Sequence, residues 1–316
     1  MTRRWLLSLI LAGLVLAPPA VASGTFRRER PPTLTVSGTV ATPTTYTLSQ
    51  LQALPQTTFS LTRPSWWRES HTDTDQGVPV EDLVNAAQPT LPAAKNALLR
   101  VTVAISSTWG RSVTFALGEL NPSFGNHPAY LALQQDGHQL PAPELVVPGD
   151  TAPARSLEAV DRINIAVQNP TPTTPPAFGA VTVEDGPRTT VLTSTELAAL
   201  PARTLDVTFQ AGTTTQHHVE TGPTLQDVLH AAHIHSGLNT WVAAVGSDGY
   251  VATVTPAEAW VGARPLLISL NEDGTPLTQP RLVTDGDVKG GRYVSDIVDL
   301  VVGQAPPPAW PSQGNR

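Results

Sequence analysis

The sequence contains one short helical segment twice, and this repeat constrains the fold more than any other feature. Residues 77–87 read GVPVEDLVNAA, and residues 222–232, which begin 145 positions later, read GPTLQDVLHAA. In both segments a proline near the start is followed by an acidic residue and a final Ala-Ala pair, which favours a short helix entered through proline. A self-similar period of domain size indicates that the chain holds two copies of one folding unit.

The segments around this helix repeat in the same order. Thr47 and Thr193 each precede a Gln or Glu by three residues, the capping-box pattern of a helix start. Asp136 and Asp273 each open an Asp-Gly turn and lie 137 residues apart. The decrease in spacing from 145 to 137 places the length difference between the copies in loops, where insertions cost least.

Short runs rich in β-branched residues alternate with turn residues between the helices, which is typical of strands. We therefore predict an α+β fold, in which each half holds a mixed, mostly antiparallel sheet and a few short helices. The run PTPTTPP at residues 170–176 can neither pair in a sheet nor continue a helix, so it indicates a linker. The predicted organisation is a signal peptide (1–22), a first copy (33–167), a Pro/Thr linker (168–177), a second copy (178–303) and a flexible tail (304–316).

The first residues have the pattern of an export signal. A basic start is followed by an apolar run at residues 5–17 and by the small-x-small sequence AVA at residues 20–22. The apolar run is shorter than the roughly 20 residues of a membrane span, and no later stretch approaches that length, so we expect no membrane span. Arg3 and Arg4 leave a plain Sec signal and a twin-arginine signal both open. We expect an exported bacterial protein, periplasmic or extracellular.

Composition excludes several classes of function. The chain has no cysteine, so it offers no disulfide, thiolate metal ligand or thiol nucleophile. Its formal charge is −7, which argues against nucleic acid or an anionic membrane surface as a partner. We find no nucleophile elbow, Walker-type loop, dinucleotide fingerprint or persuasive Ser-His-Asp spacing, so hydrolase and nucleotide-dependent functions lack support.

Several stretches, taken in order, resemble the oxidoreductase molybdopterin-binding domain, the fold of the sulfite oxidase family. In the first half they are LTVSGTVATPTTYTLSQLQALP, GVPVEDLVNAA and ELVVPGDTAPARSL. In the second half they are LTSTELAALP, GPTLQDVLHAA, SDGY and RLVTDGDVKGGRYV. The resemblance covers residues 33–167 and 178–303, and it implies two tandem sulfite-oxidase-like domains and molybdopterin as a cofactor.

In that family a molybdenum ion is held by a pterin dithiolene and one protein cysteine. A hydroxyl group cannot supply the electronic character of a soft thiolate ligand, and this chain has no cysteine. The resemblance therefore supports the fold more than the reaction. Our first hypothesis is a ligand-binding or interaction module without this chemistry. The alternative is a molybdopterin-dependent oxidoreductase with no protein ligand, or with Ser65, Ser70 or Asp73 in that role.

The resemblance also implies a ligand-contacting loop at Arg155, with Ser156 beside it, and at Arg292 in the second half. A guanidinium group suits this role because it can donate two parallel hydrogen bonds to a phosphate. Lys289 and the glycines beside it could let a ligand approach backbone amides, with Tyr250 as a wall of the cleft. Alternatively, each arginine bonds carbonyls of its own loop and pins that loop to the sheet. The implied ligand is a pterin or another small planar or anionic molecule.

Two further clusters have more than one interpretation. His230, His233 and His235 form an H-x2-H-x-H pattern that could bind zinc or copper, or could interact with the C-terminus of the preceding helix. Trp66 and Trp67 could stack on a planar ligand or anchor a protein partner, or could close over the domain core.

Overall fold

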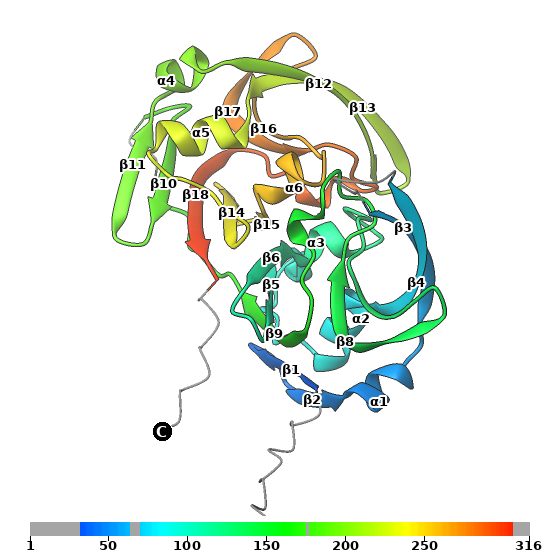
Figure 1. Cartoon of the computed structure of the whole chain (residues 1–316). Coiled ribbons are helices and arrows are strands. Elements are labelled where there is room, and N and C mark those ends of the chain that lie inside the picture. Colours follow the sequence, from blue (N-terminus) through cyan, green and yellow to red (C-terminus); the bar gives the residue numbers. More distant parts are fainter. Residues whose placement is uncertain (1–31, 64–69, 175–176, 306–316) are drawn as a thin grey trace, which may run out of the picture. The chain divides into compact units, whose positions relative to one another are not determined.

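The computed structural model describes residues 32–63, 70–174 and 177–305, and it shows the same order of strands and α-helices in two halves (Figure 1). The predicted signal peptide, Ser65, Trp66, Trp67 and nearly all of the predicted tail lie outside these residues. Predictions for those parts of the chain therefore stay predictions.

The first half contains a five-stranded and a four-stranded sheet. The five-stranded sheet has the order β2-β1-β9-β5-β6, and only its β1–β9 pair is parallel. Its strands are β1 (Thr33–Gly38), β2 (Thr44–Thr47), β5 (Val101–Ser107), β6 (Ser112–Ala116) and β9 (Val160–Val167). The four-stranded sheet is antiparallel and comprises, in order, β3 (Thr57–Arg63), β4 (His71–Pro79), β7 (Tyr130–Gln135) and β8 (His138–Val146).

The second half repeats both sheets strand for strand. Its five-stranded sheet has the order β11-β10-β18-β14-β15, again with one parallel pair, β10–β18. These strands are β10 (Val181–Asp185), β11 (Arg188–Leu192), β14 (Thr240–Gly246), β15 (Val251–Val254) and β18 (Ile297–Gln304). The antiparallel four-stranded sheet comprises, in order, β12 (Ala202–Ala211), β13 (Thr214–Pro223), β16 (Leu266–Glu272) and β17 (Thr275–Thr284).

This architecture confirms a sheet-rich chain with mostly antiparallel sheets in two similar halves, and it is consistent with the predicted α+β class. Each half has two sheets where the sequence predicted one. Local patterning indicates which segments are strands, but it does not reveal which strands pair. The sulfite-oxidase-like identity of the fold stays a prediction.

The helices are short, and the repeated segments form two of them, α2 (Val80–Ala87) and α5 (Leu225–Ala231). The capping boxes at Thr47 and Thr193 are both present, at the starts of α1 (Leu48–Gln52) and α4 (Ser194–Ala199). The remaining helical turns are α3 (Leu117–Leu120), α6 (Ala257–Trp260), η1 (Ala97–Arg100), η2 (Pro153–Arg155) and η3 (Gly290–Arg292). No helix in the described residues is both long and apolar enough to cross a membrane.

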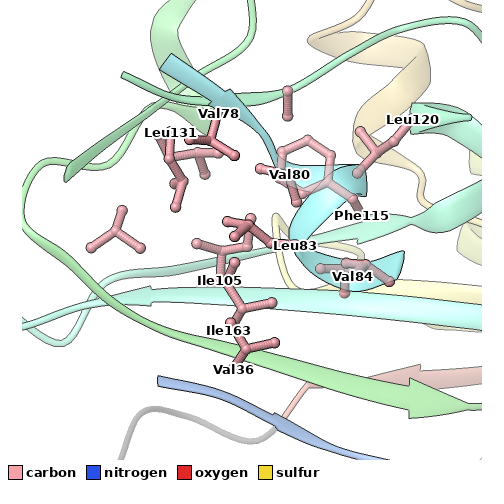
Figure 2. Packing of buried hydrophobic residues seen from close by; sticks show 14 of the residues in the cluster. Val36, Val78, Val80, Leu83, Val84, Ile105, Phe115, Leu120, Leu131 and Ile163 are labelled. Carbon is pink, nitrogen blue, oxygen red and sulfur yellow. The ribbon is translucent and has the colours of Figure 1, made fainter. Parts of the chain in front are cut away.

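The core of the first half forms where α2 packs between its two sheets. The buried face of α2 comprises Val80, Leu83, Val84 and Ala87, which follow the i, i+3, i+4, i+7 spacing of an amphipathic helix. These residues share one apolar cluster with side chains from both sheets, drawn together in Figure 2; the labelled strand residues are Val36, Val78, Ile105, Phe115, Leu131 and Ile163.

The two halves share packing and hydrogen bonds. Leu99 and Phe124, from the first half, belong to the core cluster of the second half. The Thr253 hydroxyl donates to the carbonyl oxygen of Leu99 at 2.8 Å. The backbone nitrogen of Thr114 donates to the carbonyl oxygen of Leu238 at 2.9 Å. The core of the second half therefore includes side chains that the first half supplies.

We expect Leu83→Ala to lower the free energy of unfolding by about 2–5 kcal/mol, because it removes buried methyl groups and leaves a cavity. Urea denaturation of the purified protein measures this loss. Leu91→Ala is the matched control, since Leu91 is 41% exposed. Equal losses in the two variants would contradict the packing described for α2.

Candidate functional site

Each half holds a fully buried arginine between two carboxylates. Arg155 lies in η2, where its Nε donates to Asp150 Oδ2 at 2.9 Å and its Nη1 donates to Glu119 Oε1 at 2.6 Å. The Arg155 guanidinium also stacks over the Phe115 ring, 4.9 Å from the ring centre. Because Asp150 is in the same loop and Glu119 is in α3, the arginine fixes the loop against a distant helical turn.

The second half repeats this arrangement at equivalent positions. Arg292 in η3 donates from Nε to Asp287 Oδ2 at 2.8 Å and from Nη1 to Glu258 Oε2 at 2.6 Å. The two aspartates, like the two arginines, are 137 residues apart in the sequence, and the two glutamates are 139 apart. We call these two groups the arginine clusters.

A second basic side chain contacts the aspartate of each arginine cluster. His127 Nε2 lies 3.1 Å from Asp150 Oδ1, and Arg264 Nη2 donates to Asp287 Oδ1 at 2.9 Å. Burial alone would raise the pKa of Asp150, but hydrogen bonds from Arg155 and His127 offset it, and the pKa lies below its ordinary value. Asp150 is therefore a carboxylate at neutral pH.

The two arginine clusters meet where the halves pack together. A Cβ added to Gly118 would lie 2.8 Å from Cδ of Arg292, and one added to Gly262 would lie 3.1 Å from Nη2 of Arg155. Glycine at these two positions thus lets each half approach the arginine of the other. A larger residue would push the two clusters apart.

Glu119 and Glu258 differ in how their oxygens are satisfied. Glu258 accepts from Arg292 through Oε2 and from the backbone nitrogen of Thr255 through Oε1. Glu119 Oε2, which is fully buried, has no hydrogen-bond partner within the described residues. Burial, followed by the negative charge of Glu258, raises the pKa of Glu119 to about 8, although the contacts with Arg155 act in the opposite direction.

The arginine partners differ from those predicted for a structural role. Instead of loop carbonyls, Arg155 and Arg292 bind carboxylates, and both guanidinium groups are buried. A carboxylate pair matches the charge and planar geometry of a guanidinium group better than neutral carbonyls do. The ligand contact predicted for these arginines stays a prediction, and it would have to replace or accompany these ion pairs.

A pocket of about 380 Å³ lies beside η3, and we call it the lysine pocket. Its lining includes Lys95, Asn96 and Phe124 from the first half and Phe209, Tyr250 and residues 289–291 from the second. Lys95 and Lys289 are the only lysines in the chain of 316 residues, and both line this pocket. No Asp or Glu among the described residues lines it.

Neither lysine forms an ion pair with another described residue. None of the ion pairs among the described residues involves Lys95 or Lys289. Both side chains are exposed at the pocket, so their ammonium groups are accessible to a ligand. In this exposure the two lysines differ from Arg155 and Arg292, which are buried.

Tyr250 forms one wall of the lysine pocket. Its hydroxyl donates to the carbonyl oxygen of Gly291 at 2.6 Å and accepts from Asn96 Nδ2 at 2.9 Å. Arg100 Nη2 donates to the carbonyl oxygen of Gly249 at 3.0 Å. Burial raises the pKa of Tyr250, so its hydroxyl stays protonated and holds segments of both halves.

The glycines of η3 serve the packing of two rings. A Cβ added to Gly290 would lie 2.5 Å from the Phe209 ring, and one added to Gly291 would lie 2.2 Å from the Phe124 ring. Phe209 also packs against Tyr293, with ring centres 4.2 Å apart. The Phe209 and Phe124 rings therefore lie against these two glycines, where we predicted that a ligand could approach backbone amides. That approach stays a prediction.

The corresponding pocket of the first half, of about 350 Å³, has a different lining. Ser156 lines it, and Ala152 stands at the repeat position of Lys289. Among the residues that the structure describes, the charged side chains of its lining are Arg63, Arg111, Glu144, Asp150 and Glu158. The two halves thus share the arginine cluster but not the charge of the adjacent pocket.

Of the three alternative oxygen ligands for molybdenum, the structure describes Ser70 and Asp73. Asp73 is 4% exposed, and its Oδ2 accepts from Arg63 Nη1 at 2.8 Å and from Gln135 Nε2 at 2.6 Å. Ser70 is exposed, and Ser65 lies outside the described residues. The carboxylate of Asp73 is therefore already engaged by two side chains of the sheet.

The histidine cluster does not converge. His230, His233 and His235 are exposed, and the rings of His230 and His235 are 6.0 Å apart. Ile234 is buried between them, and His233 has a positive φ of 61° as the chain leaves α5. Residues 32–63, 70–174 and 177–305 contain no group of three or more His, Asp or Glu side chains that could hold a metal ion. Zinc or copper binding by these histidines stays an untested alternative.

Sequence reasoning missed Lys95, Glu119 and Glu258. The glutamates recur at a spacing of 139, close to the repeat, so an alignment of the two halves would have paired them. The rarity of lysine was visible in the composition. That the two lysines line one pocket was not visible, because it depends on how the halves pack.

No family model and no curated protein sequence matches the chain. Among solved structures, the chain is similar to the sulfane dehydrogenase SoxCD from Paracoccus pantotrophus. The identity is 14%, the TM-score is 0.34, and the match covers 84% of this chain and 77% of that one.

We expect Glu119→Gln to change how stability depends on pH. The pKa of Glu119 in the fold, about 8, is above its ordinary value of 4.5, so its contribution to stability is complete below pH 4.5 and is lost as pH rises through about 8. Glutamine cannot ionise, so the variant should gain stability relative to the parent between pH 5 and 9. Urea denaturation across this range measures the difference; a gain of the same size in the exposed control Glu158→Gln would contradict it.

We expect Arg155→Met and Arg292→Met each to lower the free energy of unfolding by about 3–5 kcal/mol, because each leaves two buried acidic side chains, at least one of them a carboxylate at pH 7, without their partner. Arg111→Met, which removes an exposed guanidinium, is the control. Chemical denaturation at pH 7 compares the three variants. A loss below about 1 kcal/mol, typical of a surface ion pair, would show that the arginine clusters do not hold the loops.

Proposed function

We propose that the chain is a ligand-binding protein whose lysine pocket takes a small, planar, anionic molecule, and that it does not perform thiolate-ligated molybdenum chemistry. One observation carries the proposal: the two lysines of the chain line the same pocket, although they are 194 residues apart in the sequence. The proposal includes export, which rests on the predicted signal at residues 1–22.

The charges around the lysine pocket favour an anion. The chain as a whole is acidic, with a formal charge of −7, yet the pocket lining has two ammonium groups and no described carboxylate. Arg100 adds a further positive charge beside Tyr250. An ammonium group without a counterion in a partly enclosed pocket attracts anions and forms charge-assisted hydrogen bonds with them.

The shape and apolar lining favour a planar molecule of modest size. Its volume of about 380 Å³ falls within the range of small-molecule sites, which is roughly 300–1,000 Å³. The half-buried rings of Phe209 and Tyr250 line it beside the lysines. Aromatic side chains provide flat apolar surfaces on which a planar ligand can stack.

The residues present do not fit a thiolate-ligated molybdenum centre. The sequence has no cysteine, and Asp73 is engaged by Arg63 and Gln135. The arginines that the family resemblance assigns to the cofactor are buried against carboxylates. A metal-free pterin that carries a carboxylate or phosphate remains within the proposed class of planar anions.

We expect the purified protein to bind 6-carboxypterin saturably, with Lys289→Ala weakening the affinity by about tenfold or more, which corresponds to roughly 1.4 kcal/mol. Fluorescence titration of the pterin measures binding, and 2-naphthoate serves as a second planar anion. Arg188→Ala is the control, since it removes an exposed positive charge outside this pocket.

Failure of both anions to bind, or equal binding by the parent and Lys289→Ala, would refute the proposal. Elemental analysis of protein purified from its native host tests the alternative directly. Stoichiometric molybdenum in that preparation would favour the oxidoreductase.

A further inference from the structure

The two lysines approach the pocket from different halves, and one hydroxyl group links the segments that carry them. Lys95 precedes Asn96, whose side-chain amide donates to the Tyr250 hydroxyl at 2.9 Å. Lys289 lies two residues before Gly291, whose carbonyl oxygen accepts from the same hydroxyl at 2.6 Å. Tyr250 therefore holds both lysine-bearing segments around a single atom.

Further backbone contacts fix these segments. The backbone nitrogen of Gln210 in β12 donates to the carbonyl oxygen of Val288 at 2.9 Å. The backbone nitrogen of Val288 donates in turn to the carbonyl oxygen of Phe124 at 2.7 Å. The turn after Lys95 is closed by a hydrogen bond from Leu99 nitrogen to Asn96 oxygen at 2.9 Å. The attachment points of the two lysines are thus set before a ligand arrives, and only their side chains need to become ordered.

The pocket consequently presents two like charges without a described carboxylate between them. A ligand with one negative charge neutralises one ammonium group and leaves the other unpaired. A ligand with two negative charges pairs with both and also relieves their mutual repulsion. We therefore expect the lysine pocket to bind a ligand with two negative charges more tightly than a ligand with one.

We infer that the lysine pocket selects a planar molecule with two negative charges, which contacts Lys95 of the first half and Lys289 of the second at once. This inference rests on the proposed function, because it names the ligand class of the same site. The two charges can come from two separate carboxylates or from one phosphate. The shared requirement is a doubly negative planar ligand.

The test compares three naphthalene probes by isothermal titration calorimetry at low ionic strength. 2-Naphthoate has one negative charge, 2,6-naphthalenedicarboxylate has two at separate ends, and 2-naphthyl phosphate has two on one group near pH 8. We expect at least one doubly charged probe to bind about tenfold more tightly than 2-naphthoate. Which one does so distinguishes separated carboxylates from a phosphate.

The lysine variants show whether the preference arises in this pocket. We expect Lys95→Gln and Lys289→Gln each to reduce the preference for the doubly charged probe to nearly onefold, while Arg188→Gln keeps it at about tenfold. Both lysines are exposed, so these variants should fold, and far-UV circular dichroism checks this.

The two proposals fail in different ways. Equal affinity for singly and doubly charged probes, with binding that still depends on the lysines, would overturn this inference and leave the proposed function standing. A preference that survives in both lysine variants would also overturn it. Absence of binding by all three probes would count against the proposed function itself.

Discussion

The buried ion pairs of Arg155 and Arg292 are the constraint on which the loops of both halves depend. A guanidinium group removed from water is tolerated only where acidic side chains compensate its charge and accept its hydrogen bonds, and each arginine here donates to one aspartate and one glutamate. One partner comes from the same loop and the other from a helical turn more than thirty residues earlier in the chain. Each pair thus fixes a loop relative to a separate element, and the adjacent pocket takes its shape from that attachment.

The repeated arginine clusters also explain the contact between the halves. Glu119 and Glu258 each accept a hydrogen bond from the arginine of their own half, and the negative charge of Glu258 raises the pKa of Glu119. Two carboxyl groups can lie close together in a buried contact when one of them keeps its proton and is therefore neutral. The contact is therefore held by apolar packing around Leu99 and Phe124 and by a set of charges that is close to balanced near neutral pH.

Much of the fold was predictable because it is encoded locally. The capping threonines, the amphipathic face of α2 and the Asp-Gly turns are short-range signals, and their repetition revealed two similar halves. The division of each half into two sheets was not predictable, since strand pairing is a long-range property. The carboxylate partners of the arginines were missed because α3 and α6 are four residues long and carry no distinctive pattern. The lysine pocket combines residues from both halves, so only the tertiary structure reveals it.

Leu99 and Phe124 of the first half are part of the core of the second half, so the two copies of this repeat cannot be separated without loss. Duplicated units are often treated as independently folding domains that can be separated at the connecting segment. Here a cut at that segment would remove two apolar side chains from the interior of the C-terminal fragment and leave a hollow open to water. The second half therefore depends on the first for part of its core, and an engineered copy of the second half alone would need new residues to close that core.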